Sequence, residues 1–347
     1  AIVFILLLFL YLFPFVNIRE DKVKKIILPN SNILYLFSWG IVVLSLLSIF
    51  YFTPTVVRIF SLNDLNFARQ QMLRGEGYTE ESLINTIASV SASFYTIALF
   101  LFFIYRAKGT NKKLSILLLI SSVSYVLNVF AYVGRDGVVF WIFSFIGTYG
   151  LFHNFLPRTE KKNMKRVLTL FLILAIPLFM GITYDRFSDN PFAGILSYAG
   201  QSFPNFCLWY EADYPVSNGA AFPLFREILG LPIAEAESGE YGGTFSWFFG
   251  TFLKSFMANF GIIGTIILGV FMGLIIFVSF KRNYTYMGFN QLFLYFLYFQ
   301  IYSQGVFYFR QYTRGGNLFI ILSIIFYIIF SFSRRFDNRQ VVLNAIE

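Results

Sequence analysis

Residues 114–137 read LSILLLISSVSYVLNVFAYVGRDG, and residues 138–156 continue as VVFWIFSFIGTYGLFHNFL. Each apolar stretch, 114–133 and 138–156, is close to the length of about 20 residues that a helix needs to cross the hydrocarbon core of a bilayer. Only the turn Gly134-Arg135-Asp136-Gly137 separates them. The pattern predicts two membrane-spanning helices joined by a tight turn that carries one guanidinium and one carboxylate.

The composition extends this interpretation to the whole chain. Of its 347 residues, 57% are hydrophobic and 21% are aromatic, while only 13% are charged. A soluble domain of this composition would expose large apolar patches and aggregate. The short alternating segments of a membrane β-barrel are not evident. We therefore expect an all-α, polytopic integral membrane protein.

Nine membrane spans are predicted, and we expect them to form one transmembrane domain over residues 1–347. They cover about residues 2–16, 32–52, 83–104, 114–133, 138–156, 167–184, 257–280, 289–309 and 317–332. The first span begins without a methionine, so we expect the true start upstream and ten or more spans in the full chain. No basic leader segment or cleavage site accompanies it, and it is not interpreted as a signal peptide.

Basic residues predict which loops face the cytoplasm, because short cytoplasmic loops carry an excess of Lys and Arg. Under strict alternation of nine spans, five basic segments fall on one side: Arg19–Lys25, Arg106–Lys113, Arg158–Arg166, Lys281–Arg282 and the tail from Arg334. We assign that side to the cytoplasm. The first outer loop (53–82) and the long outer loop (185–256) then face outward. We expect function there, since long structured loops are uncommon without a role.

The two sides differ in their kind of basic residue. The predicted inner side has ten lysines, eight arginines and five acidic residues. The predicted outer side has one lysine, eight arginines and thirteen acidic residues. Arginine binds phosphate through paired hydrogen bonds. The net charge of +9 is a topogenic signal and an attraction to anionic lipids, and it gives no support to nucleic-acid binding. The asymmetry favours an enzyme that acts on a lipid-linked anion at the outer face.

The long outer loop has too many apolar and aromatic residues for a flexible linker. Residues Ile195–Tyr210, with Trp209 at headgroup level, and Phe222–Leu231 are predicted to form short interfacial helices over a cavity. The alternative is a lid that only packs against the spans.

Four arginines lie near the predicted outer interface, where an unpaired charge costs at least a few kcal/mol. They are Arg135, Arg186, Arg310 and Arg314, and Arg69 lies in the first outer loop. Two or three guanidinium groups can match the oxygens of a pyrophosphate. The alternative is structural, with ion pairs such as Asp185–Arg186 or side chains that reach to lipid phosphates.

Carboxylates and aromatic side chains complete the candidate site. Asp136 and Glu211 are the preferred candidates for a general base on a sugar hydroxyl, although a structural or surface role stays open for both. Tyr308 and Trp209 are candidates for contact with a glycan or a polyprenyl tail. With one cysteine (Cys207) and one histidine (His153), neither a disulfide nor a Cys- or His-based metal site is predicted.

The order of these features resembles the bacterial O-antigen and oligosaccharide repeat-unit polymerases (Wzy-type). The resemblance rests on Leu62-Asn-Asp-Leu-Asn-Phe-Ala-Arg69, Gly134-Arg135-Asp136-Gly137, the long outer loop and Asn259-Phe-Gly-Ile-Ile-Gly264 at the start of the next span. These motifs are short, but the resemblance covers most of the chain.

The resemblance implies a multi-span glycosyltransferase that works without a metal or other cofactor at the outer face of the bacterial plasma membrane. It would transfer a growing glycan from undecaprenyl pyrophosphate to the terminal sugar of a new lipid-linked unit, in lipopolysaccharide or capsule synthesis. By position, Arg135 and Arg310 best match the outer arginines that this family is thought to need, followed by Arg69, Arg186 and Arg314. The resemblance also suggests a chain-length regulator as a partner, beside membrane lipids.

Other functions fit less well. O-antigen ligases are associated with a histidine in the large outer loop, and membrane acyltransferases of polysaccharides also rely on a histidine, whereas His153 is predicted at the inner side. A flippase for lipid-linked oligosaccharides is the alternative from another class. Transporters bind charge along a path through the bilayer and commonly have paired halves, but here ionisable residues gather at one face and no internal repeat is visible.

Overall fold

The structure is a computed structural model that describes the chain except for residues 18–22, 63, 74–81, 187–191, 193, 195, 197–199, 212–215, 233–249, 281–284, 337–340 and 346–347. About 81% of the described residues are helical, which confirms the predicted helical membrane class. Contacts divide the chain into two compact units. Unit 1 comprises Ala1–Lys22, Ile195–Thr285 and Asn290–Ile329, and unit 2 comprises Val23–Gly194, Tyr286–Phe289 and Phe330–Glu347.

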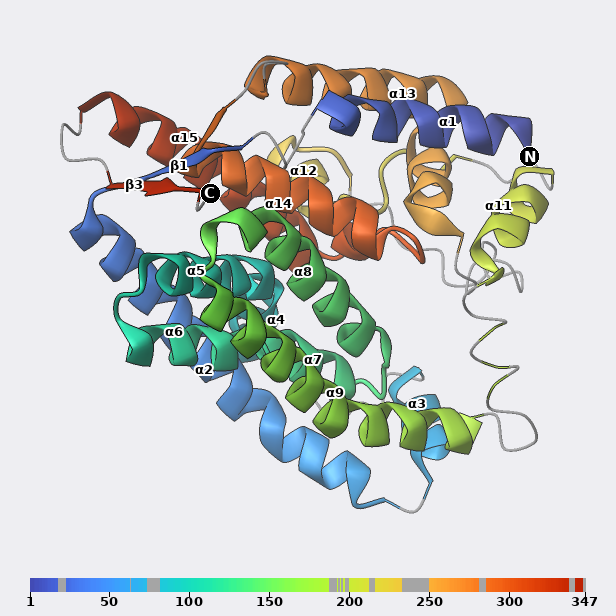
Figure 1. Ribbon diagram of the computed structural model, residues 1–347. Coiled ribbons are helices and arrows are strands. Elements are labelled where there is room, and N and C mark those ends of the chain that lie inside the picture. Colours follow the sequence, from blue (N-terminus) through green and yellow to red (C-terminus); the bar gives the residue numbers. More distant parts are fainter. Residues whose placement is uncertain are drawn as a thin grey trace. The chain divides into compact units, whose positions relative to one another are not determined.

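Unit 2 contains a bundle of helices from the first half of the chain (Figure 1). Its helices are α2 (Ser31–Phe60), α3 (Leu65–Leu73), α4 (Leu83–Ser93), α5 (Tyr95–Lys108), α6 (Lys112–Ser121), α7 (Ser124–Phe130), α8 (Asp136–Phe152) and α9 (Arg158–Arg186), with a 3₁₀ turn at His153–Phe155. The end of α5 and the start of α9 are joined by an ion pair between Arg106 Nε and Glu160 Oε2, 3.5 Å apart.

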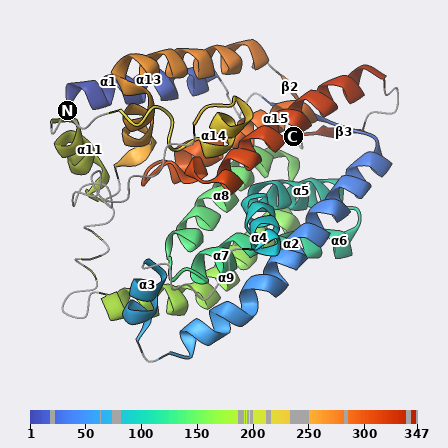
Figure 2. The ribbon, with the colours of Figure 1, turned by 180° about the vertical axis from the view of Figure 1, so that it is seen from behind.

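Helix α5 is the central helix of this bundle. Every residue from Tyr95 to Tyr105 is buried, and a helix that is apolar on all sides needs other helices around it. It packs against α2, α6 and α8 (Figures 1 and 2). The Tyr95 ring stacks on Tyr125 with centroids 4.5 Å apart, and its hydroxyl lies 3.0 Å from Ser144 Oγ. This hydroxyl is therefore satisfied inside the apolar core.

A small sheet belongs to unit 2 and was not predicted from the sequence. Strand β1 (Lys25–Leu28) lies between β2 (Tyr286–Gly288), which runs parallel to it, and β3 (Val341–Asn344), which runs antiparallel. A hydrogen-bonded sheet cannot have a bilayer passing through it, so the three strands lie on one side of the membrane. An even number of predicted spans separates each strand from the next, as this requires. Which side it is remains a prediction from the charges.

The predicted count of nine spans is matched only in part by helix length. Among the described residues, six helices are long and apolar enough to cross a membrane, and the pair α4–α5 would be a seventh. That pair is bent by 45°, so residues 83–104 are not one straight helix. Helix α1 has 11 residues and α14 has 16, less than a full span. The count of nine stays a prediction.

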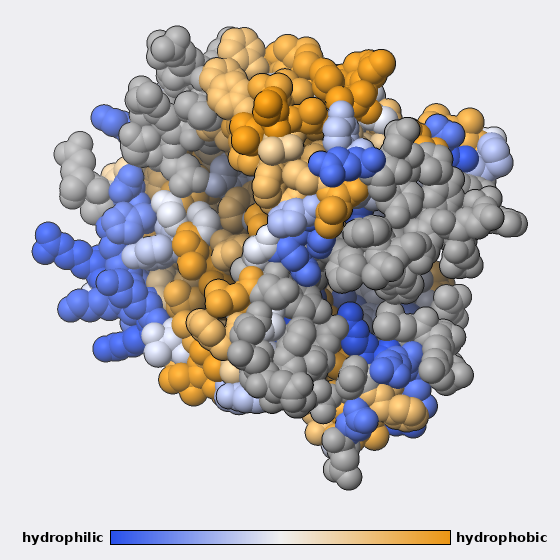
Figure 3. Space-filling view, turned by 90° about the vertical axis from the view of Figure 1, so that its right-hand side faces the viewer, coloured by the Kyte–Doolittle hydropathy of each residue, from blue (hydrophilic) through white to orange (hydrophobic). Residues whose placement is uncertain are grey.

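The long helices keep broad apolar faces that no other described part of the protein covers. Examples are Leu174 on α9 and Val278 on α13 (Thr251–Ser279), both 73% exposed. Figure 3 shows such side chains as orange areas of the surface. Surfaces of this kind suit contact with lipid tails. The helices thus have the outward faces of a membrane-embedded protein.

Unit 1 combines the first helix with helices from the second half of the chain. They are α1 (Ile2–Leu12), α11 (Ser202–Glu211), α12 (Pro223–Ile228), α13, α14 (Phe289–Gln304) and α15 (Arg314–Phe336) up to Ile329, with 3₁₀ turns η1 (Phe13–Asn17) and η4 (Arg310–Tyr312). Helix α1 lies along α13 (Figures 1 and 2). Tyr11 donates a 2.7 Å hydrogen bond to the Thr265 carbonyl, and a Cβ on Gly269 would come within 2.9 Å of the Tyr11 ring. Small residues thus permit this close contact.

Candidate functional site

Residues 216–232 of the long predicted outer loop, called here the docked segment, are held by backbone and side-chain hydrogen bonds of unit 1. The segment lies against α13 near Gly261, whose φ of +66° breaks the helix. Ser217 N donates to the Ala258 carbonyl at 2.7 Å, and Gly219 N donates to the Asn259 carbonyl at 3.1 Å. The expected helix at 222–231 is present as the shorter α12. The segment is therefore fixed structure rather than a linker.

Two buried asparagines anchor the docked segment from different helices. Asn259 on α13 is 5% exposed, and its Oδ1 accepts from Ala221 N at 2.7 Å and from the Ser217 hydroxyl at 3.2 Å. Asn317 on α15 is fully buried, and its Oδ1 accepts from Leu224 N at 3.2 Å. Buried amides of this kind are costly unless paired, so they fix their partners strongly. Asn317 was not selected from the sequence, and Asn259 entered only as the first residue of the motif Asn259–Gly264.

The second half of the Asn317 amide holds the turn that carries the candidate arginines. Its Nδ2 donates to the Gln311 carbonyl at 2.6 Å and to the Ala221 carbonyl at 3.2 Å. Gln311 lies in η4, directly after Arg310, and Arg314 begins α15. One buried side chain therefore ties the docked segment to the turn between Arg310 and Arg314.

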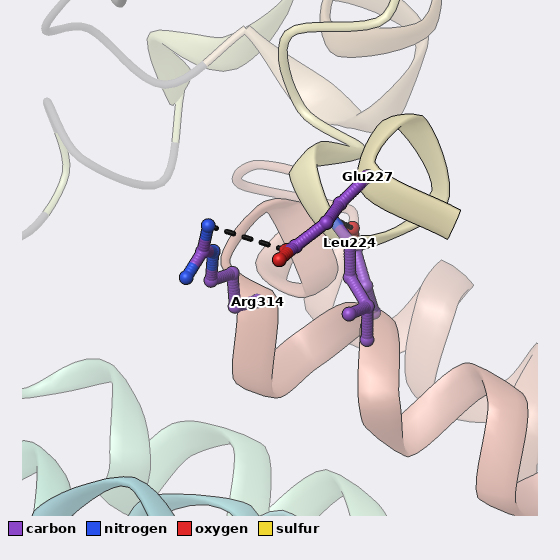
Figure 4. Close-up of polar contacts among 4 residues, drawn as sticks. Leu224, Glu227 and Arg314 are labelled. Carbon is purple, nitrogen blue, oxygen red and sulfur yellow. Dashed lines mark hydrogen bonds and ion pairs between the residues drawn. The ribbon is translucent and has the colours of Figure 1, made fainter. Parts of the chain in front are cut away.

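An ion pair also joins the docked segment to this turn. Arg314 Nη2 lies 3.2 Å from Glu227 Oε2 on α12 (Figure 4). Leu224, one turn before Glu227, is the residue whose N–H is bound by Asn317, so α12 is oriented with Glu227 toward α15. The Arg314 side chain is 59% exposed and the Glu227 side chain is 50% exposed. Glu227 was not among the carboxylates selected from the sequence, because its partner lies far along the chain.

Arg310 itself is half-buried beside an aromatic cluster. Tyr308, two residues earlier, forms an isolated parallel bridge with Thr251 at the start of α13. The rings of Phe309 and Phe256 lie 5.0 Å apart, and those of Tyr308 and Tyr312 lie 6.5 Å apart. The structure thus brings Tyr308, Arg310 and Arg314 into one turn region, as the sequence order suggests.

Lys254 is a buried cation in the first turns of α13 that the sequence analysis passed over. It is 9% exposed, and its side chain lies over Gly250, where an added Cβ would be 2.1 Å from the lysine Cδ. It is the one lysine that the charge pattern assigned to the outer side. Its place, one turn after the Thr251–Tyr308 bridge, adds a positive charge to the same part of unit 1.

Arg135 and Asp136 lie in unit 2, in the tight turn that was predicted between two helices. Arg135 is 7% exposed, and its guanidinium lies 5.6 Å above the Phe179 ring centroid. A Cβ on Gly134 would come within 2.6 Å of Val129 Cγ1, and one on Gly137 within 2.8 Å of Val129 Cβ. Both glycines are therefore required for the close turn that buries Arg135. Asp136 is half-buried at the first position of α8.

The remaining candidates are spread over other elements. Arg69 is half-buried on α3, which contacts α9. Trp209 is half-buried and Glu211 exposed on α11, which packs against α1 and α13. Arg186 ends α9, and its side chain lies outside the described residues, as do Arg74, Asp189 and Asp213.

Metal-binding groups do not assemble in the described parts of either unit: no three His, Cys, Asp or Glu side chains come together there. Comparison with known proteins yields no match of the chain to a family model, a curated protein or a solved structure.

Proposed function

We propose that the protein polymerises lipid-linked oligosaccharide repeat units at the outer face of the bacterial plasma membrane. The donor is a growing glycan on undecaprenyl pyrophosphate, and the acceptor is the terminal sugar of a new lipid-linked unit. The observation that carries this proposal is the turn from Arg310 to Arg314, in which two arginines lie on either side of Gln311, whose carbonyl accepts a hydrogen bond from the fully buried Asn317. Such an arrangement pre-places donors for an anionic group next to a docked outer segment.

The chemistry that these residues would perform is glycosyl transfer. The bond between the anomeric carbon and the pyrophosphate oxygen breaks, and the electron pair leaves with undecaprenyl pyrophosphate. The acceptor hydroxyl oxygen forms the new bond and gives its proton to a carboxylate, for which Glu211 is the candidate within unit 1. Arg310 and Arg314 stabilise the charge that grows on the leaving pyrophosphate, and pre-placed guanidinium groups do so without reorganisation.

Arg135 has a different environment from the two arginines of unit 1. It is buried against Phe179 and hydrogen-bonded to Thr183. These contacts fix the direction of its N–H groups. A fixed direction is what an arginine needs in order to bind one oxygen of a glycan or pyrophosphate. Arg135 is proposed as the substrate-binding arginine of unit 2.

The test is complementation of a strain that lacks the gene, with surface glycan separated by length on a gel. Variants Arg310→Lys and Arg135→Lys keep the charge and remove the guanidinium fork, and each must reach the membrane at the wild-type level. The expected result is loss of long chains and accumulation of single repeat units. Arg58→Lys, an exposed arginine in the last turn of α2, is the matched control and should give normal chains.

Two other outcomes would reject the proposal. Normal polymer in the strain that lacks the gene rules out a polymerase. Lipid-linked single units that accumulate on the inner leaflet, where they are protected from added glycosidases, would instead support a flippase.

A further inference from the structure

The Arg314–Glu227 ion pair places a carboxylate of the protein on a guanidinium proposed to bind pyrophosphate. We propose that Glu227 is an internal substitute for the ligand, and that the diphosphate of a lipid-linked glycan displaces it from Arg314. This inference rests on the proposed function, because that function supplies the diphosphate. It adds a binding step in which one anion replaces another at the same guanidinium.

The geometry makes this exchange easy. The ion pair is formed through one atom on each side, Nη2 and Oε2, at 3.2 Å, and both side chains are at least half exposed. Exposed pairs of this kind contribute little to stability. A diphosphate offers several anionic oxygens and can engage two N–H groups of the guanidinium at once. The diphosphate therefore binds Arg314 more strongly than a single carboxylate oxygen does.

The anchoring of α12 limits what the exchange moves. Asn317 binds Leu224 N, and Asn259 binds Ala221 N, so the docked segment is fixed before Glu227 is reached. Loss of the ion pair leaves those bonds intact. Residues 225–232 then lose one contact with α15, while the Arg226 guanidinium still donates to the carbonyls of Asn218 and Pro232 and residues 216–224 stay bound.

The same geometry argues against Glu227 as the general base. In an inverting displacement the base lies on the face of the sugar opposite to the leaving group. A carboxylate 3.2 Å from the guanidinium that would hold the leaving pyrophosphate lies on the side of the leaving group. Its position therefore suits competition with the phosphate rather than proton transfer from the acceptor.

The experiment uses the purified full chain in lipid nanodiscs, with inorganic pyrophosphate as the probe. Pyrophosphate affinity is measured by calorimetry, and hydrogen exchange of residues 225–232 is measured by mass spectrometry. Glu227→Gln should bind pyrophosphate about two- to fivefold more tightly, the gain expected when an exposed ion pair no longer competes. Pyrophosphate should raise exchange of residues 225–232 in the wild type, and Glu227→Gln should show the raised level without the probe.

Two further variants separate the exchange from general effects. Glu160→Gln removes the ion pair with Arg106 and should change neither the affinity nor the exchange of residues 225–232. Arg314→Ala should abolish the response of these residues to pyrophosphate. Unchanged or weaker binding by Glu227→Gln overturns the inference, and so does exchange in the wild type that does not respond to the probe.

The two proposals fail in different assays. If wild-type and Arg310→Lys strains differ in glycan length but pyrophosphate leaves residues 225–232 unchanged, only the exchange at Arg314 is wrong. If the gene is not needed for polymer, the proposed function is wrong, whatever pyrophosphate does to the purified protein.

Discussion

Arg135 donates a 2.7 Å hydrogen bond from Nη1 to the hydroxyl oxygen of Thr183, which lies 48 residues further along the chain. The same hydroxyl donates to the Phe179 carbonyl at 2.7 Å. One threonine of α9 therefore connects a buried guanidinium to a helix backbone. Hydrogen bonds to charged groups are stronger than neutral ones, and a charged donor left unpaired in the interior is costly.

Replacement of Thr183 by Val should therefore destabilise unit 2 by about 1–3 kcal/mol and shorten the glycan chains, because Arg135 loses its fixed direction. Thr183→Ser keeps the hydroxyl and is the control that should behave almost as wild type. Thermal unfolding in detergent measures the first effect, and the gel profile of surface glycan measures the second. Equal stability of the valine and serine variants would show that the bond does not matter.

Asn317→Ala should release both the docked segment and the η4 turn. It removes a buried hydrogen bond to Gln311 and two part-buried ones to Leu224 and Ala221, at a cost of about 2–4 kcal/mol. Ser217→Ala removes weaker hydroxyl contacts to Ala258 and Asn259 and should cost less than about 1 kcal/mol. Limited proteolysis within residues 216–232, compared between the two variants, is the direct measurement. Equal cleavage rates would contradict the anchoring role of Asn317.

Gly316→Ala should displace the turn that carries Arg310 and Arg314. An added Cβ would come within 2.5 Å of the Gln311 Cα and 2.7 Å of its carbonyl carbon, and backbone atoms cannot move aside as a flexible side chain can. The expected result is a loss of long glycan at normal membrane levels or a clear drop in melting temperature. Gly181→Ala in α9 is the control, since nothing lies within 4 Å of its Cβ position. There alanine should be neutral or slightly stabilising.

Cysteines placed at Ile27 and Val342 should form a disulfide in a Cys207→Ala background. These residues are partners in the antiparallel pair β1–β3, and both have accessible side chains. Mild oxidation should give a reducible shift in gel mobility that neither single-cysteine variant shows. Maleimide that cannot cross membranes should label the single variants only in inside-out vesicles, if the sheet is cytoplasmic as the charges predict. Labelling in intact cells would reverse the predicted orientation.

The helical membrane class could be predicted from the sequence, because long apolar stretches suit helices in a bilayer, and six described helices are long and apolar enough to cross one. The count of nine spans is not confirmed. The Gly134–Gly137 turn was also predicted, and the structure adds the reason in the close approach to Val129. The strands were missed, since three or four residues carry no periodicity of their own and depend on partners far along the chain. The bend between α4 and α5 at Phe94 could not be predicted, because no proline or glycine lies beside it in the sequence.

The contacts within the candidate site could be predicted only in part, for a related reason. Residue types and sequence order point to Arg135, Arg310 and Arg314, because charges at membrane depth are rare enough to select. Glu227, Asn317 and Lys254 matter through contacts that form only in the fold. In the sequence, Asn317 resembles any polar residue near the start of a helix. Its role follows from two contacts of its amide, one with Leu224 of the docked segment and one with Gln311 of η4.

The central position of β1 has a consequence for how the protein is made. Lys25–Leu28 leaves the ribosome well before both its neighbours, β2 (Tyr286–Gly288) and β3 (Val341–Asn344). While the residues between them are made, both edges of β1 lack their native partners, and unpaired edges are sites where strands of other chains can attach. The flanking lysines Lys24 and Lys25, both exposed, are charges of the kind that discourage such pairing. Closure of the sheet would then be a late event, and its completion would report that the two ends of the chain have been inserted in compatible directions.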